Sequence, residues 1–461
     1  MKLFLILNSL FLLLFFSACA PRGAMIKVDT LVAQGEYKKA AKFSQEKIDL
    51  DDIYARDNLL WQLQTAYNYL LLDEINSSTI SYFDSSEMLM KHYRQQRLSE
   101  DISQTLSATL VNDTTRPYIG TEYDGVMTNT YKAIAYMKIG DTNSARVEFN
   151  RAIDRQRRAK IFFNKMIKKE QAAIEKKELE SQEKGENLKV EDSEIDTLLN
   201  QNYSNLHNFK AYPDFVNPMT TYLAGLFAKA DKNPSKAQNL LKEAYGMMPE
   251  NKDVKDDLYK DTKEPTVWVI FENGQAPVLV EWRIDFPIWI FSDRLSYISV
   301  ALPKLVERDK AYEYLNIELD NNKTLESKYL CSMENIIKTE FEKSYPATVR
   351  RAILAAATKT AINYVVQEKA QNNGSATAAL ISIASVIYQI ASTQADTRIW
   401  TTLPKEFQLA KFTKPKSNIV TIKSPYNTLI KTIDLPNSDN ILIYVKVAKP
   451  FSKPSILVIP F

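Results

Sequence analysis

The stretch TVWVIFENG, residues 266–274, marks the point at which the chain changes from a helical to a strand-forming composition. It is rich in β-branched and aromatic residues, which favour strands. A second run, APVLVEWRIDF (residues 276–286), alternates apolar and charged side chains from Val280 onward. Asn273-Gly274 lies between the two runs and is typical of a hairpin turn. The two runs therefore predict a hairpin near the start of an α+β domain over residues 262–461.

Beyond the hairpin, the sequence predicts both strands and helices. Strand-like runs follow at residues 296–302, 313–320, 399–400, 418–423, 441–447 and 455–459. A long helical pattern starts at Met333, and Pro346 predicts a break with a second helix beginning there. The segment Ala376–Ala395 is as apolar as a membrane helix, but Ser and Gln recur through it. This pattern favours a helix buried in a folded core over a membrane segment.

Residues 28–255, before this domain, carry paired amphipathic helices. In Thr130–Arg155, large and small residues recur with the spacing of the tetratricopeptide repeat (TPR), which is about 34 residues long. A second match covers Leu223–Pro249, and weaker ones cover residues 31–43 and 59–93. The residues in register, which we expect to pack the repeats, are Tyr136, Gly140, Ala145, Phe149, Ala152, Gly225, Ala237, Leu241, Ala244 and Pro249. An unrelated all-helical bundle is the alternative.

These patterns predict a multidomain, mainly α-helical protein. An N-terminal TPR-like α-solenoid over residues 28–255 would be followed by the C-terminal α+β domain. Stacked repeats of this kind leave a concave face that commonly binds a peptide or a protein.

A basic stretch follows the clearest helix pair. Residues 151–169 contain many Lys and Arg residues, and Asp154 is their only acidic neighbour. A charged insertion over about residues 164–198 predicts a helix that overruns its repeat, followed by a connector. A solvated helix face is the favoured interpretation of the basic stretch. If the stretch is a site, it would contact anionic lipid headgroups or an acidic partner.

The first residues have the composition of an export signal. Lys2 precedes an apolar run over Leu3–Phe16, which is short for a membrane span. Small residues then lead to Cys19. The sequence FSAC at residues 16–19 resembles the lipobox of bacterial lipoproteins, with Phe16 where Leu is usual. An ordinary cleaved signal with an incidental cysteine is the alternative.

The lipobox resemblance implies that residues 1–18 are removed and that Cys19 is acylated. More than one acyl chain anchors a protein stably to a membrane. Ala20, in place of Asp after the cysteine, implies sorting to the outer membrane. Residues 19–27 would form a tether of roughly 25–30 Å at full extension. We therefore expect the folded body to lie close to the membrane and to face the periplasm.

The composition argues against several classes of function. The net charge of +3 is too small to indicate a nucleic-acid partner. Cys331 is the only cysteine besides Cys19, so we expect no intramolecular disulfide and a buried Cys331 thiol. Neither His92 nor His207 has a second ligand at metal-binding spacing, and the sequence has no phosphate loop or nucleophile elbow. We expect no catalytic residue, no metal site and no cofactor.

The sequence as a whole resembles an uncharacterised family of Gram-negative lipoproteins with TPR-like repeats. The resemblance is carried by the lipobox ending at Cys19, by VIFENGQAPVLVEWRIDFP (residues 269–287) and by ADTRIWTTLP (residues 395–404). It covers nearly the whole chain. It implies a place in the cell envelope, including peptidoglycan assembly, and no particular activity.

The signal, the lipobox and the repeats predict a membrane-anchored adaptor, not an enzyme, that binds an unidentified envelope protein. One alternative is a glycan hydrolase that uses the repeats to position its substrate. Glu272 and Glu281 flank the predicted turn and could supply a carboxylate pair, although ordinary strand-end charges are the favoured interpretation. A second alternative is a membrane-perturbing protein that acts through the helix at residues 376–395.

Overall fold

The computed structural model describes residues 23–99, 116–183, 216–260, 264–288, 296–320, 323–371 and 394–461. Residues 23–33 are helical. The further helices are α2 (Tyr37–Gln45), α3 (Asn58–Leu71), α4 (Ser77–Ser99), α6 (Glu122–Lys138), α7 (Thr142–Glu183), α9 (Pro218–Ala230), α10 (Pro234–Met247), α11 (Lys252–Tyr259) and α12 (Met333–Gln371). The strands are β1 (Thr266–Asn273), β2 (Val278–Ile288), β3 (Ser296–Val306), β4 (Asn316–Glu318), β5 (Thr324–Glu326), β6 (Lys328–Ser332), β7 (Glu406–Thr413), β8 (Ile419–Lys423), β9 (Leu429–Asp434), β10 (Asn440–Val447) and β11 (Ser455–Pro460).

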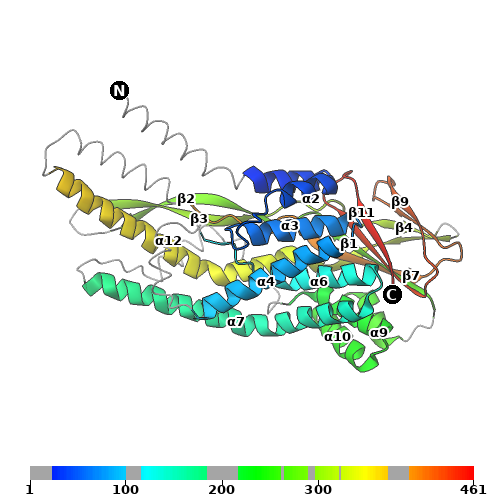
Figure 1. Cartoon of the computed structure of the whole chain (residues 1–461). Coiled ribbons are helices and arrows are strands. Elements are labelled where there is room, and N and C mark those ends of the chain that lie inside the picture. The colour runs from blue at the N-terminus through cyan, green and yellow to red at the C-terminus, as the bar shows by residue number, and fades with distance from the viewer. Residues whose placement is uncertain are drawn as a thin grey trace.

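The described strands form a central sheet, a smaller sheet and a ribbon. The central sheet has the order β11-β10-β1-β7-β6, the smaller sheet has the order β5-β4-β8-β9, and β2 pairs with β3 in the ribbon. Within the central sheet, β1 is parallel to β10 and antiparallel to β7. One face of the central sheet packs on the helices and the other packs on the smaller sheet. Figure 1 shows the smaller sheet at the opposite end of the molecule from the free ends of α7 and α12.

Strand β1 lies at the centre of the fold and is buried along its whole length. Successive side chains of a strand point to opposite faces of the sheet. Trp268 and Ile270 therefore join the hydrophobic cluster shared with the helices, whereas Val267, Val269 and Phe271 join the cluster shared with the smaller sheet. A strand covered on both faces needs a nearly continuous apolar sequence. This explains the composition of TVWVIFEN.

The prediction of a mainly α-helical, multidomain protein with an N-terminal TPR-like α-solenoid is wrong, because the fold is α+β. One hydrophobic cluster joins helix residues such as Tyr67 and Tyr131 to sheet residues such as Tyr444. In a solenoid, each repeat contacts only its neighbours. Here α3 and α6 are buried around almost their whole circumference, because the central sheet covers a face that we expected to be open.

The predicted hairpin between the two β-rich runs is also wrong. Strand β1 ends at Asn273 and β2 begins at Val278, but the two strands belong to different sheets. The side chain of Asn273 donates a hydrogen bond to the carbonyl of Tyr312 at 2.6 Å. Asn273-Gly274 therefore ends a buried strand and contacts a neighbouring loop instead of reversing the chain.

Helix α12 continues through Pro346, where we predicted a break. Proline removes one backbone N–H from the helix. The neighbouring side chains of Tyr345, Ala347 and Val349 are buried, so packing on both sides compensates for the missing hydrogen bond. Residues 399–400, predicted as a strand, have no regular secondary structure.

The helix pairs expected at residues 130–155 and 223–249 correspond to α6–α7 and α9–α10, and α7 overruns its partner. Residues 1–22, 184–215 and 376–393 lie outside the described residues. The signal, Cys19 and the apolar segment therefore stay predictions. Among the described helices, none combines the length and the apolar composition needed to cross a membrane.

Residues 23–33 and α2 form an N-terminal helical hairpin whose turn contacts the central sheet. Gly35 in this turn has φ +74°, a left-handed conformation that favours glycine. A methyl group at Gly35 would lie 2.6 Å from the backbone nitrogen and 2.7 Å from Cβ of Lys453, in the turn between β10 and β11. Only glycine allows this approach. Figure 1 shows the hairpin, in dark blue, close to the start of β11.

Candidate functional site

Several of the predicted packing residues lie on or beside α7. Ala145, Phe149 and Ala152 are buried on α7. Tyr136 of α6 is half-buried against the main core, and Gly140 takes φ +80° in the turn between α6 and α7. These residues hold neighbouring helices together.

The second predicted set lies on α9 and α10. Ala237, Leu241 and Ala244 are buried on α10. A methyl group at Gly225 of α9 would lie 3.0 Å from the Leu241 side chain, so glycine lets the two helices approach closely. Pro249 is exposed in the turn that follows α10.

One polar group within the core is the Glu272 centre, formed by the Glu272 carboxylate and three tyrosine hydroxyls. Tyr67 donates to Oε2 at 2.5 Å, and Tyr131 and Tyr444 each donate to Oε1 at 2.6 Å. All four side chains are fully buried or nearly so. Burial, with the charge of Glu272, raises the pKa of each of the three tyrosines well above its usual value, so all remain protonated donors.

The Glu272 centre joins the helices to the sheet. Tyr67 comes from α3, Tyr131 from α6, Tyr444 from β10 and Glu272 from β1. The Nζ atom of Lys446 lies 4.0 Å from Oε2 of Glu272. Burial lowers the pKa of Lys446 to about 8, and the Glu272 carboxylate opposes this shift. Because the hydroxyls take the place of water around a buried charge, the centre fixes the helices on the sheet.

The structure does not bring together the other residues considered from the sequence. Glu281 lies on the ribbon and accepts a hydrogen bond from Nε of Arg283 at 2.9 Å, away from Glu272. Cys331 is buried in β6, and burial raises the pKa of its thiol. His92 packs on Tyr54 with 4.4 Å between ring centroids. His207 lies outside the described residues.

The described residues hold no group of three or more His, Cys, Asp or Glu side chains arranged to bind a metal ion.

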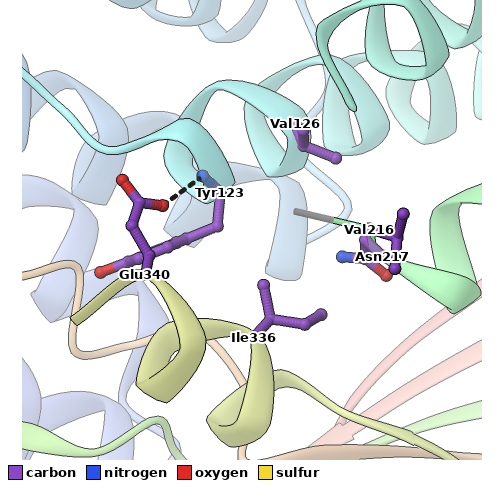
Figure 2. A pocket seen from close by; sticks show the side chains of 6 residues that line it. All are labelled: Tyr123, Val126, Val216, Asn217, Ile336 and Glu340. Atoms are coloured by element: carbon purple, nitrogen blue, oxygen red, sulfur yellow. Dashed lines mark hydrogen bonds between the residues drawn. The ribbon is translucent and has the colours of Figure 1, made fainter. Parts of the chain in front are cut away.

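A small pocket, with room for no more than about one water molecule, lies between α6, α12 and the segment before α9 (Figure 2). Its walls are formed by Tyr123, Val126, Val216, Asn217, Ile336 and Glu340. Figure 2 shows the Glu340 carboxylate of α12 at the first turn of α6. It accepts hydrogen bonds from the backbone N–H groups of Glu122 at 3.0 Å and Tyr123 at 3.3 Å. Glu340 thus satisfies free N–H groups at the helix N-terminus and joins α12 to α6.

Three carboxyl groups gather at this end of α6. Burial raises the pKa of Glu340 to about 8, and the Glu122 carboxylate adds to this rise while the N–H hydrogen bonds oppose it. Burial also raises the pKa of Asp124 to about 6, against the hydrogen bonds from Tyr118 and Thr121. Burial raises the pKa of Glu122 as well, and the positive charge of Arg94 opposes this rise.

We expect the protein to lose stability as the pH rises from about 5 to about 8. A glutamate in an unfolded chain titrates near about 4.3. Between that value and its raised folded pKa, Glu340 holds a proton in the folded state but not in the unfolded state. The free energy of unfolding therefore falls as the pH rises through this interval, by about 1–3 kcal/mol. Urea unfolding at several pH values measures the change.

The matched variant for this prediction is Glu340→Gln, which has nearly the same shape and cannot ionise. Its stability should change less between the two pH values than that of the parent protein. An equal pH dependence in both proteins would show that Glu340 does not cause it.

Two exposed aromatic rings, Tyr426 and Phe451, lie side by side at the tips of two β-turns. We call them the aromatic pair. Tyr426 is 72% exposed and Phe451 is 70% exposed, with 6.3 Å between ring centroids and 27° between ring planes. The buried ring of Tyr312 lies beneath, 6.5 Å from Tyr426 and 6.4 Å from Phe451. The structure therefore presents two large apolar rings to solvent on a fixed support.

A proline precedes the aromatic residue in each turn. In the turn over residues 449–452, the Ser452 N–H donates to the Lys449 carbonyl at 3.1 Å. Phe451 has φ +62°, at a position where glycine is favoured, so the phenylalanine is strained by about 1–2 kcal/mol. The Phe451 N–H donates to the Tyr312 hydroxyl at 2.8 Å, which holds the turn in place.

The second turn, over residues 424–427, is built in a similar way. The Asn427 N–H donates to the Ser424 carbonyl at 3.0 Å, with Pro425 and Tyr426 as the central residues. Asn427 then takes the left-handed conformation, with φ +59°. Asparagine tolerates this conformation better than most residues do.

Replacing Phe451 with glycine should leave the free energy of unfolding unchanged or raise it by up to about 1 kcal/mol, because it relieves the left-handed strain. The ring is mostly exposed, so its removal exposes little core. Phe451→Ala, which removes the ring but keeps the strain, should be less stable than Phe451→Gly by about 1 kcal/mol. Urea unfolding of both variants measures the difference. A glycine variant less stable than the alanine variant would contradict the strain.

Helices α7 and α12 and the β2–β3 ribbon extend together beyond the rest of the molecule (Figure 1). We call them the arm. With 42 residues in α7 and 39 in α12, each helix is about 60 Å long. Arg158, Ile161, Lys165 and Lys168 are exposed and lie three or four residues apart, so they share one face of α7. Ile161 is 73% exposed within this basic face.

Comparison of the chain with protein-family models finds no match, and comparison with curated proteins finds none either. The resemblance to a lipoprotein family therefore stays an expectation from the sequence.

Sequence reasoning did not identify the aromatic pair, the Glu272 centre or the position of Glu340. The sequence did indicate the two turns that carry the aromatic pair, because Pro425-Tyr426 and Pro450-Phe451 both occur in short polar segments typical of turns. Nothing in the sequence indicated that the two turns meet.

Proposed function

We propose that this chain is a lipid-anchored protein of the bacterial cell envelope that acts as an adaptor and binds another envelope protein through the arm. The observation that carries the proposal is the exposed basic face of α7 on an element that extends beyond the rest of the molecule. The export signal and Cys19 would place the protein at the outer membrane, with its body in the periplasm. The partner would have an acidic surface that matches the basic face.

The arm has the fixed geometry that a binding element needs. The Arg94 guanidinium of α4 lies 3.7 Å from the ring centroid of Phe162 in α7. Nζ of Lys169 in α7 donates to the carbonyl of Arg97 in α4 at 2.9 Å. Helix α12 contacts both α7 and β3. Because these contacts brace α7, its basic face meets a partner with little loss of conformational freedom on binding.

Site-specific crosslinking in cells tests the proposal. A photoreactive residue in place of Ile161, in the full chain, should give a discrete crosslinked product with an envelope protein. Reversing two charges beside it, with Lys165→Glu and Lys168→Glu, should reduce this product at least tenfold, because like charges then face the partner.

The matched control reverses two exposed lysines on α11, with Lys252→Glu and Lys255→Glu. It should leave the Ile161 product unchanged. If Ile161 gave no product, or if both double variants reduced it equally, the arm would not be the binding element. A product with glycan in place of protein would favour the glycan hydrolase alternative.

A further inference from the structure

We infer that the outer face of the N-terminal helical hairpin and the aromatic pair form one surface that lies on an anionic lipid bilayer. The inference rests on the proposed function in one respect, since that function supplies a bilayer close to the start of the folded body. Beyond that function, the inference names the face of the folded body that contacts the lipid and the chemistry of the contact.

The outer face of the hairpin is basic. Its exposed lysines are Lys27, Lys38, Lys39 and Lys42, and Lys47 is exposed just after α2. Glu36 lies 3.3 Å from Lys39, and Glu74, between α3 and α4, lies 3.7 Å from Lys38, both as exposed ion pairs. Glu46 is exposed just after α2, and Asp49, Asp51 and Asp52 are exposed in the segment that follows. Residues 23–47 carry more exposed lysines than exposed glutamates, and clustered lysines next to a membrane anchor are attracted to anionic headgroups.

The contact at Gly35 joins this basic face to the aromatic pair. The backbone of the hairpin turn packs against Lys453, two residues after Phe451. Lys449 and Lys453 are exposed two residues before and two residues after the exposed Phe451. An apolar ring between lysines suits the boundary of a bilayer, because the ring enters the acyl region while the ammonium groups meet the phosphates.

The start of the described chain places this surface within reach of the anchor. The helix over residues 23–33 is about 16 Å long, and residues 19–22 span at most about 14 Å. Gly35 lies two residues beyond this helix, so its contact lies within about 40 Å of Cys19. A glycan could also stack on the aromatic pair, but it would leave the lysines of the hairpin without a role. The charges favour the lipid surface.

Vesicle binding without the acyl anchor tests the inference. The chain from residue 19 to residue 461, carrying Cys19→Ser, is sedimented with vesicles of phosphatidylethanolamine and phosphatidylglycerol, and separately with phosphatidylcholine vesicles. We expect binding to the anionic vesicles that is at least tenfold tighter than binding to the neutral ones. Raising the salt concentration should weaken it, because the attraction is electrostatic.

Two variants test the two parts of the surface. Lys39→Glu, Lys42→Glu and Lys47→Glu together should weaken binding to the anionic vesicles at least tenfold, since each basic residue contributes about fivefold. Phe451→Gly, which suits the turn conformation, should weaken it about tenfold. The control reverses three exposed lysines on α10 and α11, Lys242, Lys252 and Lys255, and should bind as the parent protein does.

Three outcomes would overturn the inference. They are an absence of vesicle binding, an equal loss of binding in both triple variants, and binding to purified peptidoglycan that depends on Phe451 and replaces binding to vesicles. The last outcome would assign the aromatic pair to a glycan. The test uses neither the acyl anchor nor a protein partner, so a negative result leaves the adaptor proposal standing. A missing crosslink at Ile161 likewise leaves the lipid surface standing.

Discussion

Replacing Glu272 with leucine should lower the free energy of unfolding by about 3–5 kcal/mol. The change would leave the buried hydroxyls of Tyr67, Tyr131 and Tyr444 without their acceptor and Lys446 without its counter-charge. An unsatisfied buried polar group costs about 1–3 kcal/mol, and relaxation of the core would recover part of the sum. Urea unfolding of the full chain measures the loss.

Two further variants show whether the loss comes from the missing acceptor. Glu272→Gln keeps the volume and one acceptor oxygen, so it should be clearly more stable than Glu272→Leu. Glu313→Leu removes an exposed carboxylate that pairs with Lys310, and it should change the free energy of unfolding by no more than about 0.5 kcal/mol. A Glu272→Leu protein as stable as the parent would show that the centre does not hold the helices on the sheet.

Replacing Gly35 with alanine should lower the free energy of unfolding by about 2–4 kcal/mol. The methyl group would overlap the backbone of Lys453, and the left-handed conformation would add its own strain. The hairpin turn would have to move away from the β10–β11 turn. Limited proteolysis should then cut the N-terminal hairpin faster than in the parent protein.

Gly140→Ala is the matched control for Gly35→Ala. Gly140 has φ +80° but open space where a methyl group would lie, so only the backbone strain of about 1–2 kcal/mol applies. The difference between the two variants isolates the contact with Lys453. Equal losses in both would show that this contact contributes nothing.

The sequence predicted the kinds of elements better than their arrangement. The change to strands near residue 266, the start of α12 at Met333 and several late strands were predicted correctly. The solenoid was wrong because periodicity indicates which residues are buried and not what covers them. The sequence of α3, NLLWQLQTAYNYLL, already argued against an open solenoid face. A helix that is apolar around most of its circumference is covered on more than one side.

The candidate sites depended even more on long-range structure. The Glu272 centre joins residues 67, 131, 272 and 444, and no local pattern relates these positions. Likewise, each Pro-aromatic pair predicts a turn, but the 6.3 Å separation of the two rings depends on how the two sheets stack. The basic face of α7 was visible in the sequence, whereas its place on the arm was not.

The position of β1 between β7 and β10 determines when the molecule can finish folding. Helices α3 and α6 precede all of these strands in the chain, whereas β10 and β11, which complete the sheet beside β1, are the last strands described. Until β10 and β11 are in place, the central sheet cannot fully cover the apolar surfaces of α3 and α6. The helices therefore remain prone to aggregation until β10 and β11 are made, and a deletion of β11, which contacts α3 and α6, would uncover the core.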